Sequence, residues 1–135
     1  MLRFLSPEWV AAFGEAVSPI EVPETGADAG LAVRHGEFAT CVMARTESGD
    51  TVSVTLTVAG GRLTARAGAA RDAAVTVRVG WNDAIAFMAG TWAPTTGLAG
   101  GRAQVRGDLC VLRATGLALE AVQPYLFALR EDTGY

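Results

Sequence analysis

The chain has 135 residues, of which 50% are hydrophobic and 19% are charged. A chain of this length is expected to form one domain, spanning residues 1–135, that buries enough surface to fold without a metal ion or a disulfide. The formal net charge is −3, and the 11 basic residues, all arginines, are scattered from Arg3 to Arg130 without a basic run. Nucleic acid is therefore not an expected partner, because binding to a phosphate backbone depends on clustered positive charge.

The N-terminal segment predicts an amphipathic helix and a cytoplasmic protein. MLRFLSPEWVAAF lacks the uninterrupted apolar stretch of a secretory signal, and no run in the chain reaches the roughly 18–20 apolar residues of a membrane helix. Ser6, Pro7 and Glu8 are typical of an N-cap, a first helical position and a first-turn acid. The helix should end before Pro19, and its apolar stripe comprises Trp9, Val10, Phe13 and Val17.

A polar connection over residues 18–30 precedes three predicted strands. They span 38–45, 51–58 and 62–67, and are separated by the turn sequences Ser48-Gly49-Asp50 and Gly60-Gly61. In the middle strand every second residue is apolar, and serine or threonine residues stand between them. This alternation predicts an antiparallel meander with one apolar and one hydroxyl-bearing face, so that helices cover only one side of the sheet.

The next segment predicts a strand followed by a short helix. Alternating valines mark a strand over 72–79, and the pattern then changes to a helical period over 81–90. Asn82 is the expected N-cap of this helix, and Gly90 is the expected stop.

The last part of the chain predicts a further strand and an apolar helical tail. A Gly-rich lead at Gly101 enters a strand that ends at Gly107, and Asp108 is the expected N-cap of a helical stretch over 109–129. Gly116 and Pro124 are expected to interrupt that stretch.

Groups that could carry out catalysis are sparse. His35 is the only histidine, which excludes a multi-histidine metal site, and no Gly-x-Ser-x-Gly elbow marks a serine nucleophile. Cys41 and Cys110 lie in apolar surroundings, which is typical of buried structural thiols. Two similar Ala-Gly-Gly-Arg segments, at 59–62 and 99–102, each lead into a strand, and this context predicts turns and not phosphate loops. We therefore expect no enzymatic activity, cofactor or metal ion.

The order of these elements resembles the sterol carrier protein family, the type-two class of nonspecific lipid-transfer domains. The residues that carry the resemblance are 4–9, 73–79 and 101–108, with Arg102 where the family usually has a lysine. The resemblance implies an α+β fold with a mostly antiparallel five-stranded sheet and helices on one face. The element order is helix, three-strand meander, crossover strand, helix, strand and C-terminal helices. A composition rich in alanine and glycine, with arginine as its only basic residue, favours a stand-alone bacterial member.

The resemblance further implies an apolar tunnel between the sheet and the C-terminal helices that takes a lipid, a sterol or a fatty acyl chain. Eight apolar residues are expected to face this space: Ile85, Met88, Trp92, Leu98, Leu112, Leu119, Val122 and Leu126. The alternative is that these side chains pack into a solid core, as most apolar helix residues of small domains do.

Two other functions stay open from the sequence. One is an enzyme or accessory protein that acts on a hydrophobic metabolite in the same cavity, with His35, Arg102 or Asp108 near the substrate. The other is a dimerisation domain whose tail packs against a second chain and leaves no cavity. Transient contact with a membrane and a homodimer are both compatible with the sequence.

Overall fold

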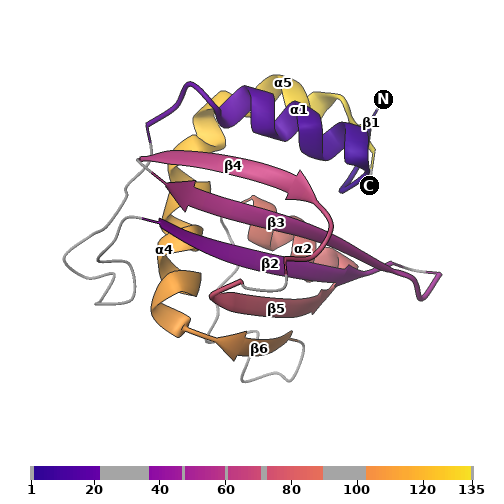
Figure 1. The fold of residues 1–135 in the computed structure, drawn as a ribbon. Helices are drawn as coiled ribbons and strands as arrows, with labels where there is room; N and C mark the ends of the chain where they lie inside the picture. Colours follow the sequence, from indigo (N-terminus) through magenta and orange to yellow (C-terminus); the bar gives the residue numbers. More distant parts are fainter. Residues whose placement is uncertain are drawn as a thin grey trace.

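A five-stranded sheet with helices on one face forms the centre of the molecule (Figure 1). The computed structural model describes residues 2–21, 37–46, 48–59, 61–70, 73–89 and 103–134. The strands are β2 (Glu37–Arg45), β3 (Thr51–Ala59), β4 (Arg62–Ala67), β5 (Val75–Gly80) and β6 (Ala103–Gly107). Their order is β4-β3-β2-β5-β6, with β2 parallel to β5 and every other pair antiparallel. This arrangement confirms the predicted α+β class and the mostly antiparallel sheet.

The two faces of the sheet differ in the way that the alternation of β3 predicts. Register places Val42 of β2 beside Val54 of β3 and Val77 of β5, and all three side chains are buried under the helices. On the opposite face, Thr55 stands next to Arg66 of β4, and no described helix covers these residues. The described helices therefore pack on the valine face and leave the hydroxyl-bearing face uncovered.

Helix α1 (Pro7–Val17) begins and packs as the sequence predicts. The Ser6 side chain accepts a hydrogen bond of 3.2 Å from the backbone amide of Trp9, which satisfies one of the free amides of the first turn. Trp9, Val10, Phe13 and Val17 are buried, and the helix packs against edge strand β4.

Helix α2 (Trp81–Met88) has its N-cap two residues before Asn82, so the prediction of Asn82 as the N-cap is wrong. Gly80 holds the N-cap position in extended conformation and makes no side-chain capping bond. The strand runs directly into the helix, so Asn82 falls inside the first turn and is exposed. Gly90, the predicted stop, lies outside the described residues.

The C-terminal stretch divides at Pro124 and not at Gly116. Helix α4 (Leu109–Val122) runs without a break through Gly116, whereas Pro124 lies in the 3₁₀ turn η2 (Gln123–Tyr125), which precedes the short helix α5 (Phe127–Glu131). Asp108 precedes α4, and its carbonyl oxygen accepts the amide of Leu112, as expected for an N-cap residue. Helix α4 contacts β2, β3 and β5, so its apolar residues close the core.

The two ends of the chain pair with each other, which the sequence does not predict. Strand β1 (Leu2–Arg3) lies parallel to β7 (Thr133–Gly134), and backbone amides of Leu2 and Phe4 donate to carbonyl oxygens of Asp132 and Gly134. This pairing places α5 beside α1, as Figure 1 shows. None of the described helices is long and apolar enough to cross a membrane.

Candidate functional site

A small cavity lies where α1, α2 and the C-terminal helices meet. Its volume is about 30 Å³, roughly the share of one water molecule in the liquid. We call it the apolar seat, and its lining residues are Phe4, Trp9, Phe13, Ile85, Met88, Ala89, Gln123, Leu126, Leu129, Arg130 and Thr133. Most of these side chains are apolar, so the seat suits a hydrocarbon group.

Aromatic rings form one wall of the seat. The Phe4 ring meets the Trp9 ring edge-on at a centroid distance of 4.9 Å, and Trp9 stacks on Phe13 at 5.4 Å. Trp9 and Phe13 are four residues apart on α1, so one helical face presents both rings to the seat. Each ring of the wall therefore packs against a neighbouring ring.

Gln123 joins the two sides of the seat. Its Nε2 donates to the carbonyl oxygen of Met88 at the end of α2 (3.0 Å) and to that of Leu119 in α4 (2.8 Å). Its Oε1 accepts a hydrogen bond from Arg130 of α5. One amide side chain therefore holds η2 and α5 against α2.

A second polar contact holds the far end of α5. The indole Nε1 of Trp9 donates to Oγ1 of Thr133 at 2.8 Å, and that hydroxyl donates in turn to the carbonyl oxygen of Leu129. The residues between the two anchors, 124–132, are called the flap. The flap is thus fixed at Gln123 and at Thr133, with Leu126 lining the seat between them.

Three of the eight predicted ligand residues line the seat: Ile85 and Met88 from α2, and Leu126 from the flap. Leu112, Leu119 and Val122 are buried on the inner side of α4, within the hydrophobic core. Trp92 and Leu98 lie outside the described residues.

The sequence did not identify the aromatic wall as part of the site. Trp9 and Phe13 belong to the predicted stripe of the first helix, but periodicity shows only which face is buried and not what it contacts. Gln123 and Thr133 were also missed, because their role depends on contacts between segments that are far apart in the chain.

The two sides of the flap differ in exposure to solvent. Leu126 is buried, whereas Tyr125 and Phe127 on either side of it are 63% and 68% exposed. The inner side of the flap is formed by buried Leu126 and half-buried Leu129.

Of the other residues considered for chemistry, the structure describes the side chains of Cys41 and Asp108. Cys41 is a buried free thiol, as predicted, and no group of three His, Cys, Asp or Glu side chains among the described residues could hold a metal ion. His35 and Arg102 lie outside the described residues, and the side chain of Cys110 is not described. Asp108 directly precedes α4 and is not among the residues that line the seat.

Comparison with known proteins supports the fold assignment. No protein-family model matches the sequence, and no curated protein matches it. Solved structures do match. A conserved hypothetical protein of Thermus thermophilus, described as a candidate sterol carrier protein, has a TM-score of 0.62 at 15% identity, covering 93% of this chain and 91% of its own.

Two further structures agree with this match. A UbiJ-SCP2 ubiquinone synthesis protein has a TM-score of 0.58 at 15% identity, covering 86% of this chain and 96% of its own. Palmitated SCP2L2 of Aedes aegypti has a TM-score of 0.56 at 18% identity, covering 85% of this chain and 95% of its own. The predicted resemblance is therefore confirmed at the level of the fold: the chain has the fold of sterol carrier protein 2.

Proposed function

We propose that this chain is a cytoplasmic carrier of a hydrophobic small molecule, a lipid, a sterol or a fatty acyl chain, which binds at the apolar seat. The main observation behind this proposal is that segments far apart in the sequence bring Ile85, Met88 and Leu126 together with an aromatic wall. The sterol carrier fold supports this assignment, and a palmitated structural neighbour supports an acyl chain as the ligand.

The polar groups at the seat favour an apolar ligand. Gln123 and Thr133 already bond to protein partners, so they hold the flap in place. Removing hydrocarbon from water then supplies the affinity, about 0.8 kcal/mol for each buried methylene. We infer binding by partition, without a chemical step.

A ligand has to widen the seat as it binds. A volume of about 30 Å³ is far below the roughly 300–1,000 Å³ typical of ligand pockets. Outward movement of the flap would withdraw Leu126 and extend the seat toward the core residues Leu119 and Val122. Exposing one leucine costs about 2–3 kcal/mol, so the first three or four buried methylenes of a ligand offset this part of the opening cost.

This reasoning predicts a steep dependence of affinity on chain length. Delipidated protein is titrated with saturated fatty acids of eight to sixteen carbons, in competition with a fluorescent fatty acid. The association constant should rise about threefold to fourfold per methylene, because 0.8 kcal/mol corresponds to that ratio. An affinity that is the same for all lengths, or no displacement at all, contradicts the proposal.

A matched pair of variants tests whether the ligand binds at the seat. Ile85 is half-buried in the lining, so Ile85→Gln should keep the fold and weaken palmitate binding about tenfold or more through a polar group in the apolar wall. Leu117→Gln makes the same type of change on the exposed side of α4 and should bind like the wild type. Equal affinity of the two variants would place the ligand elsewhere.

A further inference from the structure

The face of the sheet opposite the helices carries a trough lined with arginines. Two contiguous hollows of about 470 and 490 Å³ share Met43, Arg78 and Gln104 as lining residues. Arg45 lines the first hollow, and Arg106 lines the second. Each volume falls within the range typical of small-molecule sites, roughly 300–1,000 Å³.

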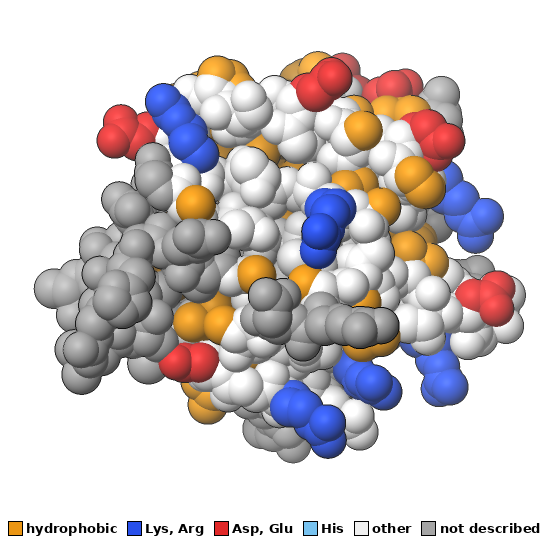
Figure 2. Space-filling model, in the orientation of Figure 1, with side chains coloured by type: hydrophobic (Ala, Val, Ile, Leu, Met, Phe, Trp, Pro, Cys, Tyr) orange, Lys and Arg blue, Asp and Glu red, His pale blue; other side chains and the backbone are white. Residues whose placement is uncertain are grey.

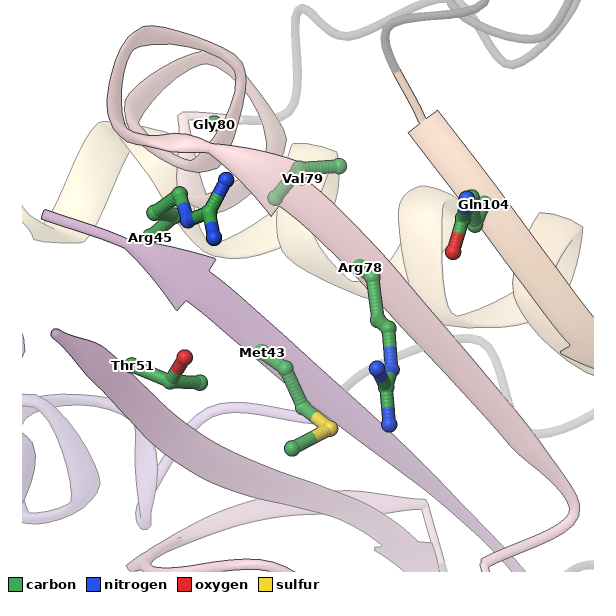
Figure 3. A pocket seen from close by; sticks show the side chains of 7 residues that line it. All are labelled: Met43, Arg45, Thr51, Arg78, Val79, Gly80 and Gln104. Carbon is green, nitrogen blue, oxygen red and sulfur yellow. The ribbon is translucent and has the colours of Figure 1, made fainter. Parts of the chain in front are cut away.

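Strand register places Arg45 and Arg106 on either side of Arg78, on the two strands that flank β5. Arg78 of β5 stands directly between Met43 of β2 and Gln104 of β6. Arg45 lies two residues beyond Met43 on β2, and Arg106 lies two residues beyond Gln104 on β6. Such diagonal positions on neighbouring strands are about 7–8 Å apart, within reach of long side chains. Figure 3 shows Arg78 extended over β2 beside Met43, in the centre of the first hollow.

Among the described side chains, no acidic group pairs with the arginines of the trough. Within the described part of the chain, no hydrogen bond or ion pair involves the guanidinium groups of Arg45, Arg78 or Arg106. No aspartate or glutamate with a described side chain lies in strands β2 to β6. In the view of Figure 2, several arginine side chains lie in the lower part of the molecule, while most acidic side chains lie along its outline. A bound anion would offset the repulsion between these exposed like charges and would stabilise the folded chain.

The remaining groups of the trough match an anionic oxygen ligand. Guanidinium groups bind phosphate in bidentate fashion, and the Gln104 amide and the Thr51 and Thr76 hydroxyls supply further donors. Met43 and buried Cys41 form an apolar floor between the arginines. The site therefore suits a ligand that combines phosphate groups with a less polar part.

We propose that this trough binds a phosphate-bearing ligand, either a soluble phosphorylated molecule or the headgroup of an anionic phospholipid. The trough is on the opposite face of the sheet from the helices that form the seat, so both sites can be filled together. The inference rests on charge and register and does not depend on the proposed carrier function.

Two binding measurements at low ionic strength distinguish the two sources of phosphate. One arm titrates the full chain with inorganic pyrophosphate by calorimetry. The other measures sedimentation with vesicles of phosphatidylglycerol and phosphatidylcholine against vesicles of phosphatidylcholine alone. Binding in the first arm supports a soluble ligand, and binding in the second arm alone supports a headgroup.

Arginine variants complete the test. Arg78→Gln and Arg106→Gln should each weaken the observed binding about tenfold, since each removes a charge-assisted hydrogen bond. Arg113→Gln, which makes the same charge change on the exposed side of α4, should weaken binding by less than about twofold. Palmitate affinity should stay unchanged in all three variants, which separates this proposal from the carrier function. Failure of both arms, or equal binding by Arg78→Gln and the wild type, would overturn the proposal.

Discussion

Replacement of Thr133 by valine tests how the flap is anchored. Valine has nearly the shape of threonine but lacks the hydroxyl that accepts the Trp9 indole N–H. Both side chains are buried, at 5% exposure for Trp9 and 8% for Thr133, so the indole donor would be left without a partner and away from water. Such a stranded donor costs about 1–3 kcal/mol. For a chain of this length the corresponding fall in Tm is about 3–5 °C per kcal/mol.

Urea unfolding of the wild type and a small set of variants isolates this effect. Thr133→Ser keeps the hydroxyl and should lose less than about 1 kcal/mol, since only a methyl group is removed. In the double variant of Thr133→Val with Trp9→Phe the donor itself is absent. The loss should therefore be smaller than the sum of the two single losses by about 1 kcal/mol or more. The anchoring role of this hydrogen bond would be refuted if the losses of unfolding free energy were additive in the double variant, or if Thr133→Val and Thr133→Ser lost the same amount.

Three further comparisons probe the scaffold by the same unfolding measurement. Gly107 and Gly68 both have positive φ, at 118° and 102°, so the backbone strain of an alanine alone should lower the unfolding free energy by about 1–2 kcal/mol at either position. At Gly107 the added Cβ would also collide with the backbone of Ala74. The total loss of unfolding free energy should therefore be several-fold larger for Gly107→Ala than for Gly68→Ala, and equal losses would contradict this. The Thr115 hydroxyl donates to a backbone carbonyl oxygen, so the Thr40 hydroxyl must donate to the oxygen of Thr115. Thr115→Val therefore leaves the Thr40 hydroxyl without its acceptor and should destabilise the protein by about 1 kcal/mol more than Thr40→Val. The reverse order would disprove that assignment of donors. Gly116→Ala should stabilise the protein by about 0.5–1 kcal/mol, since its Cβ meets nothing within 4 Å inside α4, and a loss of stability would argue against the unbroken helix.

The sheet could be predicted from the sequence because its signals are local. Alternating apolar and hydroxyl residues in β3 fix which side of the strand is buried, and Gly49 and Gly61 supply the positive φ that the hairpin turns need. The first helix carries a complete start signal in Ser6 and Pro7. These features depend on neighbours in the chain, so periodicity and turn chemistry identify them.

Features that depend on distant segments could not be predicted. The two-residue strands β1 and β7 are too short to show a period, and their pairing joins the two ends of the chain. Gly116 was expected to break the C-terminal helix, but packing of α4 on the sheet outweighs the roughly 1 kcal/mol helix penalty of one glycine. Asn82 was expected to cap α2 because of its intrinsic capping preference, but β5 runs directly into the helix and its last residue, Gly80, is the N-cap.

The same distinction applies to the two sites. Ile85, Met88 and Leu126 were expected to face a cavity because of the family resemblance, whereas the aromatic wall of the seat comes from the other end of the chain. The arginines of the trough look scattered in the sequence, from Arg45 to Arg106, and only strand register brings them onto one face.

Native mass spectrometry of delipidated protein with and without palmitate tests the carrier proposal most directly. The account predicts a complex of one chain with one palmitate, lost in the Ile85→Gln variant and retained in the Leu117→Gln variant. Octanoate, which buries fewer methylenes, should give little or no complex under the same conditions. A protein that stays free of palmitate, or that binds it equally well in both variants, would contradict ligand binding at the apolar seat.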